Sequence, residues 1–452
     1  MIKLDFEKGT IVVKSNFKLP NTVWDSRSRC YRCLPIFYKD LINYLKLSNL
    51  DYEDNVLDLM PMQNLTCDLI LHDYQEEALN KWLRTRNGAL VLPTGAGKTI
   101  IGLKAISILN VPTLVVVPTL ELVQQWKREL ENKFGIEVGA YTGEGHILKP
   151  ITVSTYDTAY LRAEELGNKF LFMIFDEVHH LPSPRYANIA EMFAAPYRLG
   201  LTATYEREDG LHKELERLIG GKVYEIGIEE LEGKHLAEYE TRKIITDLTE
   251  EEREEYEKYH RIFTKFLKEE KIILKSPRDF HLLVMRSGRN PRAREALLAR
   301  NKARRIALNS KSKLNALSEI LDRHFGERII IFTEHNSLVH TISKEFLIPA
   351  ITHTTQKAER TEILDNFRNG KYKIIVTSKV LEEGIDVPEA SVGVILSGSG
   401  SKREYKQRLG RILRKKEGKL AILYEIVSKQ TTEIGISRRR KSKNVTRRTA
   451  RN

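Results

Sequence analysis

The segment Ala89-Leu90-Val91-Leu92-Pro93-Thr94-Gly95-Ala96-Gly97-Lys98-Thr99 decides how the rest of the chain is interpreted. Four apolar residues typical of a buried strand precede a glycine-rich turn, and a helix-compatible run follows it. In such a turn, backbone N–H groups cradle phosphates, a lysine reaches the β and γ oxygens, and a threonine hydroxyl ligates Mg²⁺. We therefore predict a phosphate-binding loop made of Pro93, Thr94, Gly95, Ala96, Gly97, Lys98 and Thr99, with Lys98 catalytic and Thr99 a metal ligand.

The loop departs from the strict pattern at one position. That pattern has a glycine where this chain has Leu92, and an ordinary glycine turn without a ligand is the alternative interpretation. Everything from Gly97 onward is intact, and the turn lies between a strand and a helix as a phosphate-binding loop requires. The phosphate-binding interpretation is therefore favoured.

Apolar strand-like runs alternate with helical stretches on both sides of a long helical region. The candidate strands are 89–92, 113–117, 151–154, 171–175 and 197–201, then 329–332, 350–353, 373–377, 392–396 and 420–427. Continuous apolar strands separated by helices predict parallel sheets covered on both faces. Between the two groups, a capping box from Thr249 to Glu252 and aromatic residues at helical spacing from Tyr256 to Phe266 predict helices. The fold class expected is α/β, with two doubly wound parallel sheets, a helical insertion and a small N-terminal α+β domain.

Two acidic residues follow the candidate strand at 171–175. Ligands of parallel sheets bind outside the carboxyl ends of the strands, so Asp176 and Glu177 are expected near the phosphate-binding loop. Asp176 is a candidate Mg²⁺ ligand, and Glu177 is a candidate base that orients or deprotonates the attacking water. The alternative, a pair of surface or capping acids, is disfavoured because the loop at Lys98 precedes them.

A third element lies far downstream, where Gln407, Arg411 and Arg414 fall on one helical face at spacings of four and three. Arginines that face a nucleotide stabilise charge on the transferring phosphoryl group. A solvated basic helix is the alternative interpretation. We predict that the three side chains belong to the catalytic site.

Taken in order, these residues resemble a superfamily 2 helicase over residues 70–428. The resemblance implies two RecA-like domains with ATP and Mg²⁺ as cofactors. It also implies roles for further residues: Gln75 for adenine, Gly384 and Asp386 for the nucleotide, Pro118, Thr119, Thr155, Tyr156 and Thr377 for DNA, and His179, Thr202 and Thr204 for coupling ATP state to domain movement. A glutamine at a helix start is the alternative interpretation of Gln75.

Within that superfamily, the triplet Arg207-Glu208-Asp209, a helical thumb before the second sheet and the segment Trp24 to Arg32 are similar to XPB-type helicases. His179 in the acidic motif disfavours a DEAD-box RNA enzyme. The resemblance implies 3′ to 5′ movement, strand parting by the triplet, and a role in nucleotide excision repair or transcription-linked DNA opening. It implies single-stranded DNA and junctions as partners, together with a nuclease. A charged surface loop is the alternative for the triplet.

The domain boundaries expected from these patterns run along the whole chain. They are 1–66 for a damage-recognition-like domain, 67–240 and 311–430 for the two RecA-like domains, 241–310 for the thumb and 431–452 for a disordered basic tail. Residues 275–305 and 437–452 each carry a net charge of +8, which accounts for the chain's excess of +13 on an otherwise near-neutral body. The first segment, with Arg304 and Arg305, is expected to grip DNA phosphates, and the second to act as a non-specific tether. A solvated tail and a charged helix face are the alternative.

The remaining composition bounds the location of the protein. Three cysteines exclude a disulfide-stapled secreted fold, and Cys30 and Cys33 lack the second pair that a zinc site requires. No apolar run is long enough to cross a bilayer, so no membrane partner is expected. We expect a cytoplasmic, chromosome-associated protein of a prokaryote, specifically an archaeon. Two other functions remain open: a double-strand DNA translocase without strand separation, and a non-catalytic nucleic-acid scaffold.

Overall fold

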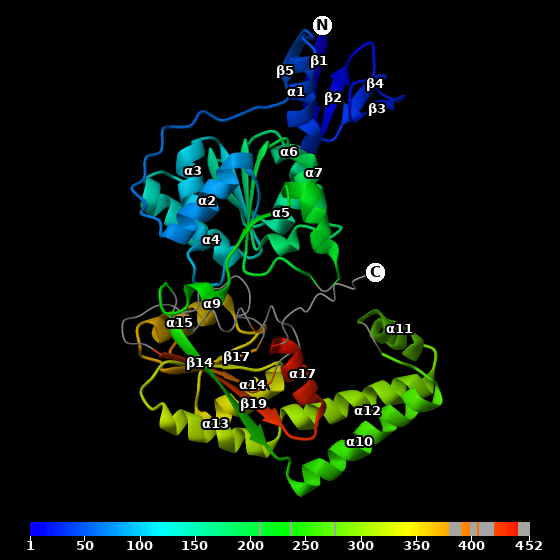
Figure 1. Cartoon of the computed structure of the whole chain (residues 1–452), viewed down its shortest axis with the longest axis vertical. Helices are drawn as coiled ribbons and strands as arrows, with labels where there is room; N and C mark the ends of the chain where they lie inside the picture. The colour runs from blue at the N-terminus through cyan, green and yellow to red at the C-terminus, as the bar shows by residue number, and fades with distance from the viewer. Residues whose placement is uncertain are drawn as a thin grey trace, which may run out of the picture. The chain divides into compact units, whose positions relative to one another are not determined.

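The computed structural model describes residues 1–207, 209–235, 237–274, 277–378, 390–397, 405 and 420–441. The chain divides after residue 236 into two compact units, whose elements are labelled in Figure 1. In the described part of the chain, no helix combines the length and the apolar character needed to cross a membrane.

The first unit begins with a small α+β domain. Its strands are β1 (Ile2–Glu7), β2 (Thr10–Lys14), β3 (Thr22–Asp25), β4 (Cys30–Cys33) and β5 (Tyr52–Asn55), in the order β3-β4-β2-β1-β5. One face of this sheet packs against α1 (Tyr38–Leu47), which follows the 3₁₀ helix η1 (Pro35–Phe37). Ala194 of the following domain joins this core, so the two domains share a packed contact.

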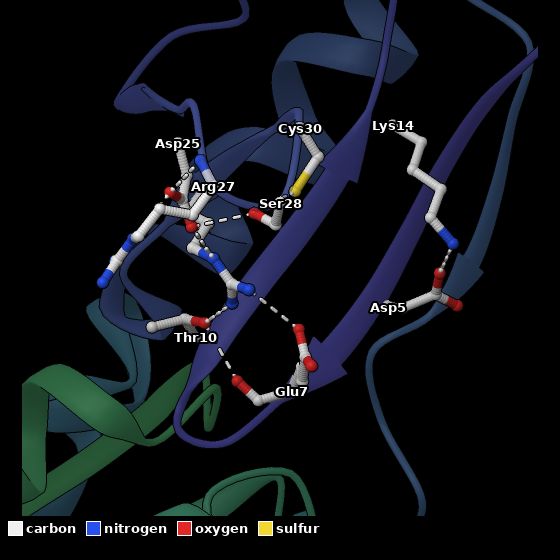
Figure 2. A network of polar contacts seen from close by, with 9 residues as sticks. Asp5, Glu7, Thr10, Lys14, Asp25, Arg27, Ser28 and Cys30 are labelled. Atoms are coloured by element: carbon white, nitrogen blue, oxygen red, sulfur yellow. Dashed lines mark hydrogen bonds and ion pairs between the residues drawn. The ribbon is translucent and has the colours of Figure 1, made fainter.

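The other face of the small sheet carries a network of ion pairs (Figure 2). The Arg32 guanidinium donates to Asp25 at 3.0 Å, to Glu7 at 2.9 Å and to Thr10 at 2.8 Å. Hydrogen bonds from Ser28, from Arg32 and from a further arginine hold the pKa of the Asp25 carboxyl well below its usual range. This face therefore neutralises much of its own charge.

The predicted CxxC pair lies on β4 of the same sheet. Both cysteines are buried and free, and three-residue spacing in a strand sends Cys30 and Cys33 to opposite faces. Burial raises the pKa of the Cys33 thiol to about 12. Opposite faces and a suppressed thiolate favour two packed thiols over a shared metal site.

The rest of the first unit is a mainly parallel sheet with helices on both faces. Its strands are β6 (Asn87–Val91), β7 (Thr113–Val117), β8 (Gly139–Thr142), β9 (Gly145–His146), β10 (Ile151–Thr155), β11 (Phe172–Asp176), β12 (Tyr197–Thr202) and β13 (Lys222–Glu225), in the order β13-β6-β12-β11-β7-β10-β8-β9. The α helices are α2 (Asp73–Thr85), α3 (Lys98–Leu109), α4 (Leu120–Phe134), α5 (Tyr156–Leu161), α6 (Ala163–Leu166), α7 (Ala187–Met192), α8 (Leu215–Ile219) and α9 (Ile228–Leu231), with 3₁₀ helices η2 (Val178–His180) and η3 (Leu211–Glu214). All five strands predicted for this region are present, and among the described strand pairs of this sheet only β8–β9 is antiparallel.

The second unit contains the second parallel sheet. Its strands are β14 (Glu238–Thr246), β15 (Ile329–Phe332), β16 (Ala350–Ile351), β17 (Ile374–Thr377), β18 (Val392–Ile395) and β19 (Leu420–Ser428), in the order β14-β19-β18-β15-β17-β16. Its described helices outside the thumb are α13 (Lys311–Arg323), α14 (Asn336–Phe346), α15 (Lys357–Arg368) and α17 (Thr432–Lys441). The predicted α/β class with two doubly wound sheets is confirmed.

One strand of this sheet, β14, was not predicted. It pairs with β19 along its full length, so residue 240, where the first RecA-like domain was expected to end, falls inside a strand of the second sheet. The side chains of this edge strand alternate between exposed and half-buried, and most are polar or charged. A search for continuous apolar runs therefore does not identify β14 as a strand.

The thumb consists of three helices, α10 (Glu250–Glu269), α11 (Pro277–Ser287) and α12 (Pro291–Leu308). The predicted capping box is present, because Thr249 Oγ1 accepts from Glu252 N at 3.2 Å and Glu252 Oε2 accepts from Thr249 N at 3.1 Å. Tyr256, Phe263 and Phe266 of α10 are buried against α12, which supplies small residues. The alanines of this stripe are Ala293, Ala296, Ala299, Ala303 and Ala307.

The C-terminal segment differs from the expected disordered tail. Residues 432–441 form α17, and Glu433, Ile436 and Ser437 are buried. The tail prediction is therefore wrong for this stretch, because the run of basic residues in the sequence concealed the buried positions just before it. Residues 442–452 lie outside the described residues.

Candidate functional site

The predicted phosphate-binding loop joins β6 to α3 at the carboxyl end of the strand. Gly95 and Gly97 have φ of 88° and 72°, a region that favours glycine, and Gly97 is the N-cap of α3. A Cβ atom at Gly97 would lie 2.4 Å from Gln75 Nε2. The loop thus brings backbone N–H groups of a helix N-terminus to the sheet edge, as anion binding requires.

The lysine of the loop lies against the loop's own carbonyl groups. Lys98 Nζ donates to Leu92 O at 3.3 Å and to Pro93 O at 3.4 Å. The Leu92 side chain is fully buried in the core. The chain's departure from glycine at this position therefore fills the core, while the main chain keeps the geometry that holds the lysine.

Gln75 braces the same loop. Its side chain is 2% exposed, Nε2 donates to Ala96 O at 3.0 Å, and Oε1 accepts from His72 N at 2.9 Å. Tyr74 donates its hydroxyl to the same Ala96 carbonyl at 3.0 Å. Nε2 and Oε1 of Gln75 each have one partner already. Adenine would therefore have to bond to the second hydrogen on Nε2 or to the second lone pair of Oε1. Recognition of adenine by Gln75 stays a prediction.

Asp176 ends β11 in a buried position near the loop. Trp126 Nε1 donates to its Oδ2 at 2.9 Å, and Glu177 N donates to its Oδ1 at 3.0 Å. Burial and the neighbouring charge of Glu177 raise the pKa of Asp176 to about 6, although Lys98 opposes the shift. Two crowded carboxylates with too little compensating positive charge are a donor set suited to a hard divalent cation such as Mg²⁺.

Glu177 lies in the left-handed region with φ of 49°, a costly conformation for a residue other than glycine. Its carboxylate approaches His179 Nδ1 at 3.3 Å and accepts from Thr202 Oγ1 at 3.4 Å. His179 Nδ1 lies 3.0 Å from Thr202 Oγ1, and Thr204 O, at 2.9 Å from the same Oγ1, is the alternative acceptor of its single hydrogen. The structure thus brings the candidate base and the three candidate coupling residues into one hydrogen-bonded group.

Arg207 connects a second loop to this group. Its Nη1 donates to His179 O at 2.6 Å, and Nε and Nη2 donate to the Asp209 carboxylate at 3.0 and 2.6 Å. The hydrogen bonds from Arg207 lower the pKa of Asp209 to about 2. Both side chains of the triplet that the structure describes therefore pair within the unit, and Glu208 lies outside the described residues.

The residues predicted to contact DNA fall into distinct local roles. Thr119 and Thr155 are N-caps that accept from the backbone of α4 and α5 at 3.3 and 3.2 Å, and Pro118 precedes the first of them. Tyr156 is 1% exposed and donates to Asp176 O at 3.1 Å, while Thr377 is fully buried and donates to Ser378 O. The side chains of Tyr156 and Thr377 are therefore buried, and contact of these two residues with DNA stays a prediction that would have to use their main chain.

The two adjacent arginines of the thumb, Arg304 and Arg305, have different surroundings. Arg304 Nη2 donates to both carboxylate oxygens of Glu334 at 2.7 Å, whereas Arg305 is exposed. The guanidinium of Arg304 therefore has an internal partner, and its contact with a DNA phosphate stays a prediction. The remaining predicted site residues, Gly384, Asp386, Gln407, Arg411 and Arg414, lie outside the described residues.

Sequence reasoning missed the role of Trp126. The indole is 1% exposed and donates a hydrogen bond to Asp176. Its ring also packs where a Cβ of Gly102 in α3 would lie, at 2.7 Å. A tryptophan on the polar helix α4, beside Leu122, Val123 and Leu130 that form its buried face, was the available signal.

Comparison with known proteins agrees with this geometry. Residues 68–207 match the family described as type III restriction enzyme, res subunit, and residues 312–416 match the helicase conserved C-terminal domain. Residues 4–56 match the Xeroderma pigmentosum group B helicase damage recognition domain. The solved Hef helicase domain of Pyrococcus furiosus aligns with a TM-score of 0.53 and 22% identity, over 80% of this chain and 96% of that one, which supports the fold alone.

Two curated relatives give the family. The chain is 46% identical to "DNA 3'-5' translocase XPB2" of Sulfurisphaera tokodaii, over 98% of this chain and 100% of the relative. It is 32% identical to "DNA 3'-5' helicase XPB" of Mycobacterium tuberculosis, over 80% of this chain and 61% of that relative. With the phosphate loop, the acidic pair and the damage recognition domain in one chain, this protein belongs to the XPB family of DNA helicases.

Proposed function

We propose that this chain is an ATP-dependent DNA motor that moves 3′ to 5′ and opens duplex DNA, in excision repair or in transcription-linked DNA opening. The observation that carries the proposal is the geometry at the end of β11, where the buried Asp176 stands beside Glu177; burial and the charge of Glu177 raise the pKa of Asp176. Asp176 lies near the Lys98 loop. The whole chain is 46% identical to a protein named a 3′-5′ translocase. Such a site is completed by a phosphate-bound divalent cation.

The described residues support specific roles at the nucleotide. Thr99 and Asp176 would hold Mg²⁺, which supplies charge neutralisation to the transferring phosphoryl group of ATP. Glu177 would accept a proton from the attacking water, with Thr202 and His179 orienting its carboxylate. Gln407, Arg411 and Arg414 are proposed to stabilise the developing phosphoryl charge, as the spacing of their helix suggests.

DNA contacts are proposed at the N-terminus of α4 and on the thumb. Pro118 and Thr119 are half-buried at the N-terminus of α4, where the positive end of the helix dipole favours a phosphate. Arg305 is exposed on the thumb and is proposed to contact the DNA backbone. Single strands and junctions are the proposed substrates, a nuclease is a proposed partner, and the protein is proposed to act on the chromosome.

Movement on duplex DNA without strand separation is the second candidate function. The Sulfurisphaera tokodaii relative is named a translocase and the Mycobacterium tuberculosis relative a helicase. Displacement of a third strand from a triplex reports movement on a duplex, whereas release of a labelled strand from a partial duplex reports unwinding.

Direction and strand separation are tested with partial duplexes that carry a single-stranded overhang of either polarity. We expect ATP-dependent strand release from the substrate with a 3′ overhang and none from the substrate with a 5′ overhang. The matched control is Lys98→Ala, which should release neither. Strand release from the 5′ overhang alone would overturn the direction, and triplex displacement without any strand release would favour the translocase.

The contact from Trp126 to Asp176 predicts a slower enzyme when the indole N–H is removed. In Trp126→Phe the buried acceptor loses a hydrogen bond to a charged group worth about 1.5–3 kcal/mol, so we expect ATP hydrolysis about 10- to 100-fold slower. The matched control is Trp82→Phe, since Trp82 is also fully buried and donates to Arg198 O at 2.9 Å, away from the acids. Equal slowing per folded molecule in both variants would contradict a positioning role for Trp126.

A further inference from the structure

One ion pair joins the thumb to the second sheet. Arg304 is on α12, and Glu334 follows the end of β15. The Arg304 side chain is 28% exposed and the Glu334 side chain only 9%, with both carboxylate oxygens accepting from Nη2 at 2.7 Å. Such a paired, largely desolvated contact is geometrically defined, unlike an exposed surface pair.

Glu334 is itself held in place by the sheet. Its backbone N–H donates to Ser397 Oγ at 2.7 Å, and Ser397 lies just beyond β18. The strands β15 and β18 are adjacent and parallel. Glu334 therefore bridges two strand ends at the carboxyl edge of the second sheet, the edge at which parallel α/β sheets bind ligands.

On the thumb side, further contacts lead from Arg304 along α12 toward α11. Arg300 lies one helical turn before Arg304, and its guanidinium is 4.4 Å from the ring centroid of Phe280 on α11. Burial, and secondarily the charge of Arg304, lower the pKa of Arg300. Phe280, Arg300, Arg304 and Glu334 thus form a row that leads from α11 along α12 to the segment after β15 (α11 and α12 are labelled in Figure 1).

The base of the thumb is fixed by separate contacts to the same unit. Ser428 Oγ at the end of β19 donates to Ala307 O at 2.8 Å, and Thr432 N donates to the Tyr256 hydroxyl at 3.1 Å. Lys311 N donates to Glu252 Oε1 at 2.9 Å. These contacts attach the thumb to the carboxyl end of β19 and to α13 and α17, and the Arg304 pair adds a charged contact at the carboxyl end of β15.

We propose that Glu334 is a positioning residue that acts through Arg304, so that the thumb follows the carboxyl edge of the second sheet during each ATP cycle. The inference rests on the proposed motor function. DNA held by the thumb then moves with the sheet that responds to the nucleotide. Arg304 serves this connection, and Arg305, exposed on the same helix, is left to contact DNA.

The connection is tested by reversing its charges. Arg304→Glu should retain DNA-stimulated ATP hydrolysis at saturating DNA, but the number of base pairs opened per ATP should fall by about tenfold, the size of a typical coupling between contacting charges. Arg304→Glu combined with Glu334→Arg should regain most of the loss, because the pair re-forms with its charges exchanged. Arg323→Glu, at an exposed position on α13 of the same unit, is the matched control and should change neither ATP hydrolysis nor the number of base pairs opened per ATP.

A milder pair of variants separates positioning from DNA contact. Arg304→Gln should leave the slope of log affinity against log salt at the wild-type value, while Arg305→Gln should reduce it by about 0.7–0.9, the loss of one phosphate contact. A reduced slope for Arg304→Gln, or a double charge reversal no better than Arg304→Glu, would overturn the proposal. Should Arg304→Glu fail to fold, Glu334→Gln replaces it, and unchanged coupling in that variant is equally decisive.

Wild-type protein measured in parallel distinguishes the two hypotheses. A wild type without DNA-stimulated hydrolysis would refute the motor function itself. A wild type that unwinds DNA, beside charge variants that leave the coupling unchanged, would refute only the role of Glu334.

Discussion

Glu177→Gln lowers the DNA-stimulated rate of ATP hydrolysis by a factor of about 10² to 10⁴, the range expected when a general base is removed. Glutamine has nearly the same shape, so it keeps the contacts near Thr202 and His179, but its amide cannot accept a proton from water. The backbone strain at Glu177, with φ of 49°, is unchanged by the substitution. The expected loss therefore falls on the chemical step, and steady-state hydrolysis at saturating DNA measures it.

The comparison with Lys98→Ala separates chemistry from binding. A fluorescent ATP analogue should still bind Glu177→Gln, whereas Lys98→Ala should lose both hydrolysis and most of the binding, because Lys98 is placed to reach the phosphates. Glu164→Gln on α6 is the matched control, since this glutamate is exposed on the same unit. Hydrolysis by Glu177→Gln at a rate close to that of Glu164→Gln would refute the assignment of Glu177 as the base.

The parallel strands were predictable because both their faces are buried, which forces continuous apolar runs such as 113–117 and 329–332. Edge strands escape this rule. β14 has one exposed edge and alternating half-buried residues, and its pairing with β19 joins segments about 180 positions apart in the sequence, so no local signal marks it. The α17 helix was missed for a related reason, because its basic residues dominate the local composition while its buried face depends on partners far away in the chain.

The candidate site was predictable where backbone conformation dictates residue type. Gly97 needs positive φ and a close approach to Gln75, and the acids need a strand end, so spacing alone finds them. The direction in which a side chain points cannot be predicted in this way. Tyr156 turns inward to Asp176, and Arg304 turns to Glu334, although both sequence contexts also fit an exposed DNA contact. Only the three-dimensional neighbours decide between the two orientations.

The second large effect is on stability and concerns the pair that anchors α17. Lys313 Nζ donates to Glu433 Oε1 at 2.7 Å and to Leu396 O at 2.8 Å, with side chains 1% and 6% exposed for the lysine and the glutamate. In Lys313→Met the carboxylate stays buried without its cation, which costs about 3–5 kcal/mol. We expect the unfolding transition of the second unit to shift accordingly in urea, and α17 to exchange its amide hydrogens faster than in wild type.

The double variant tests whether the cost comes from the abandoned charge and not from lost volume. Lys313→Met combined with Glu433→Leu should recover most of the stability, because apolar replacement of a buried ion pair is often neutral. Recovery should stop short of wild type, since Glu433 Oε2 also accepts from Ser428 N at 2.9 Å and that N–H loses its partner. Lys311→Met, exposed on the same helix, should change stability by no more than about 0.5 kcal/mol. A double variant as unstable as Lys313→Met would instead show that α17 is held by the lysine's own contacts, chiefly the bond to Leu396 O that joins α13 to the end of β18, and not by compensation of the buried charge.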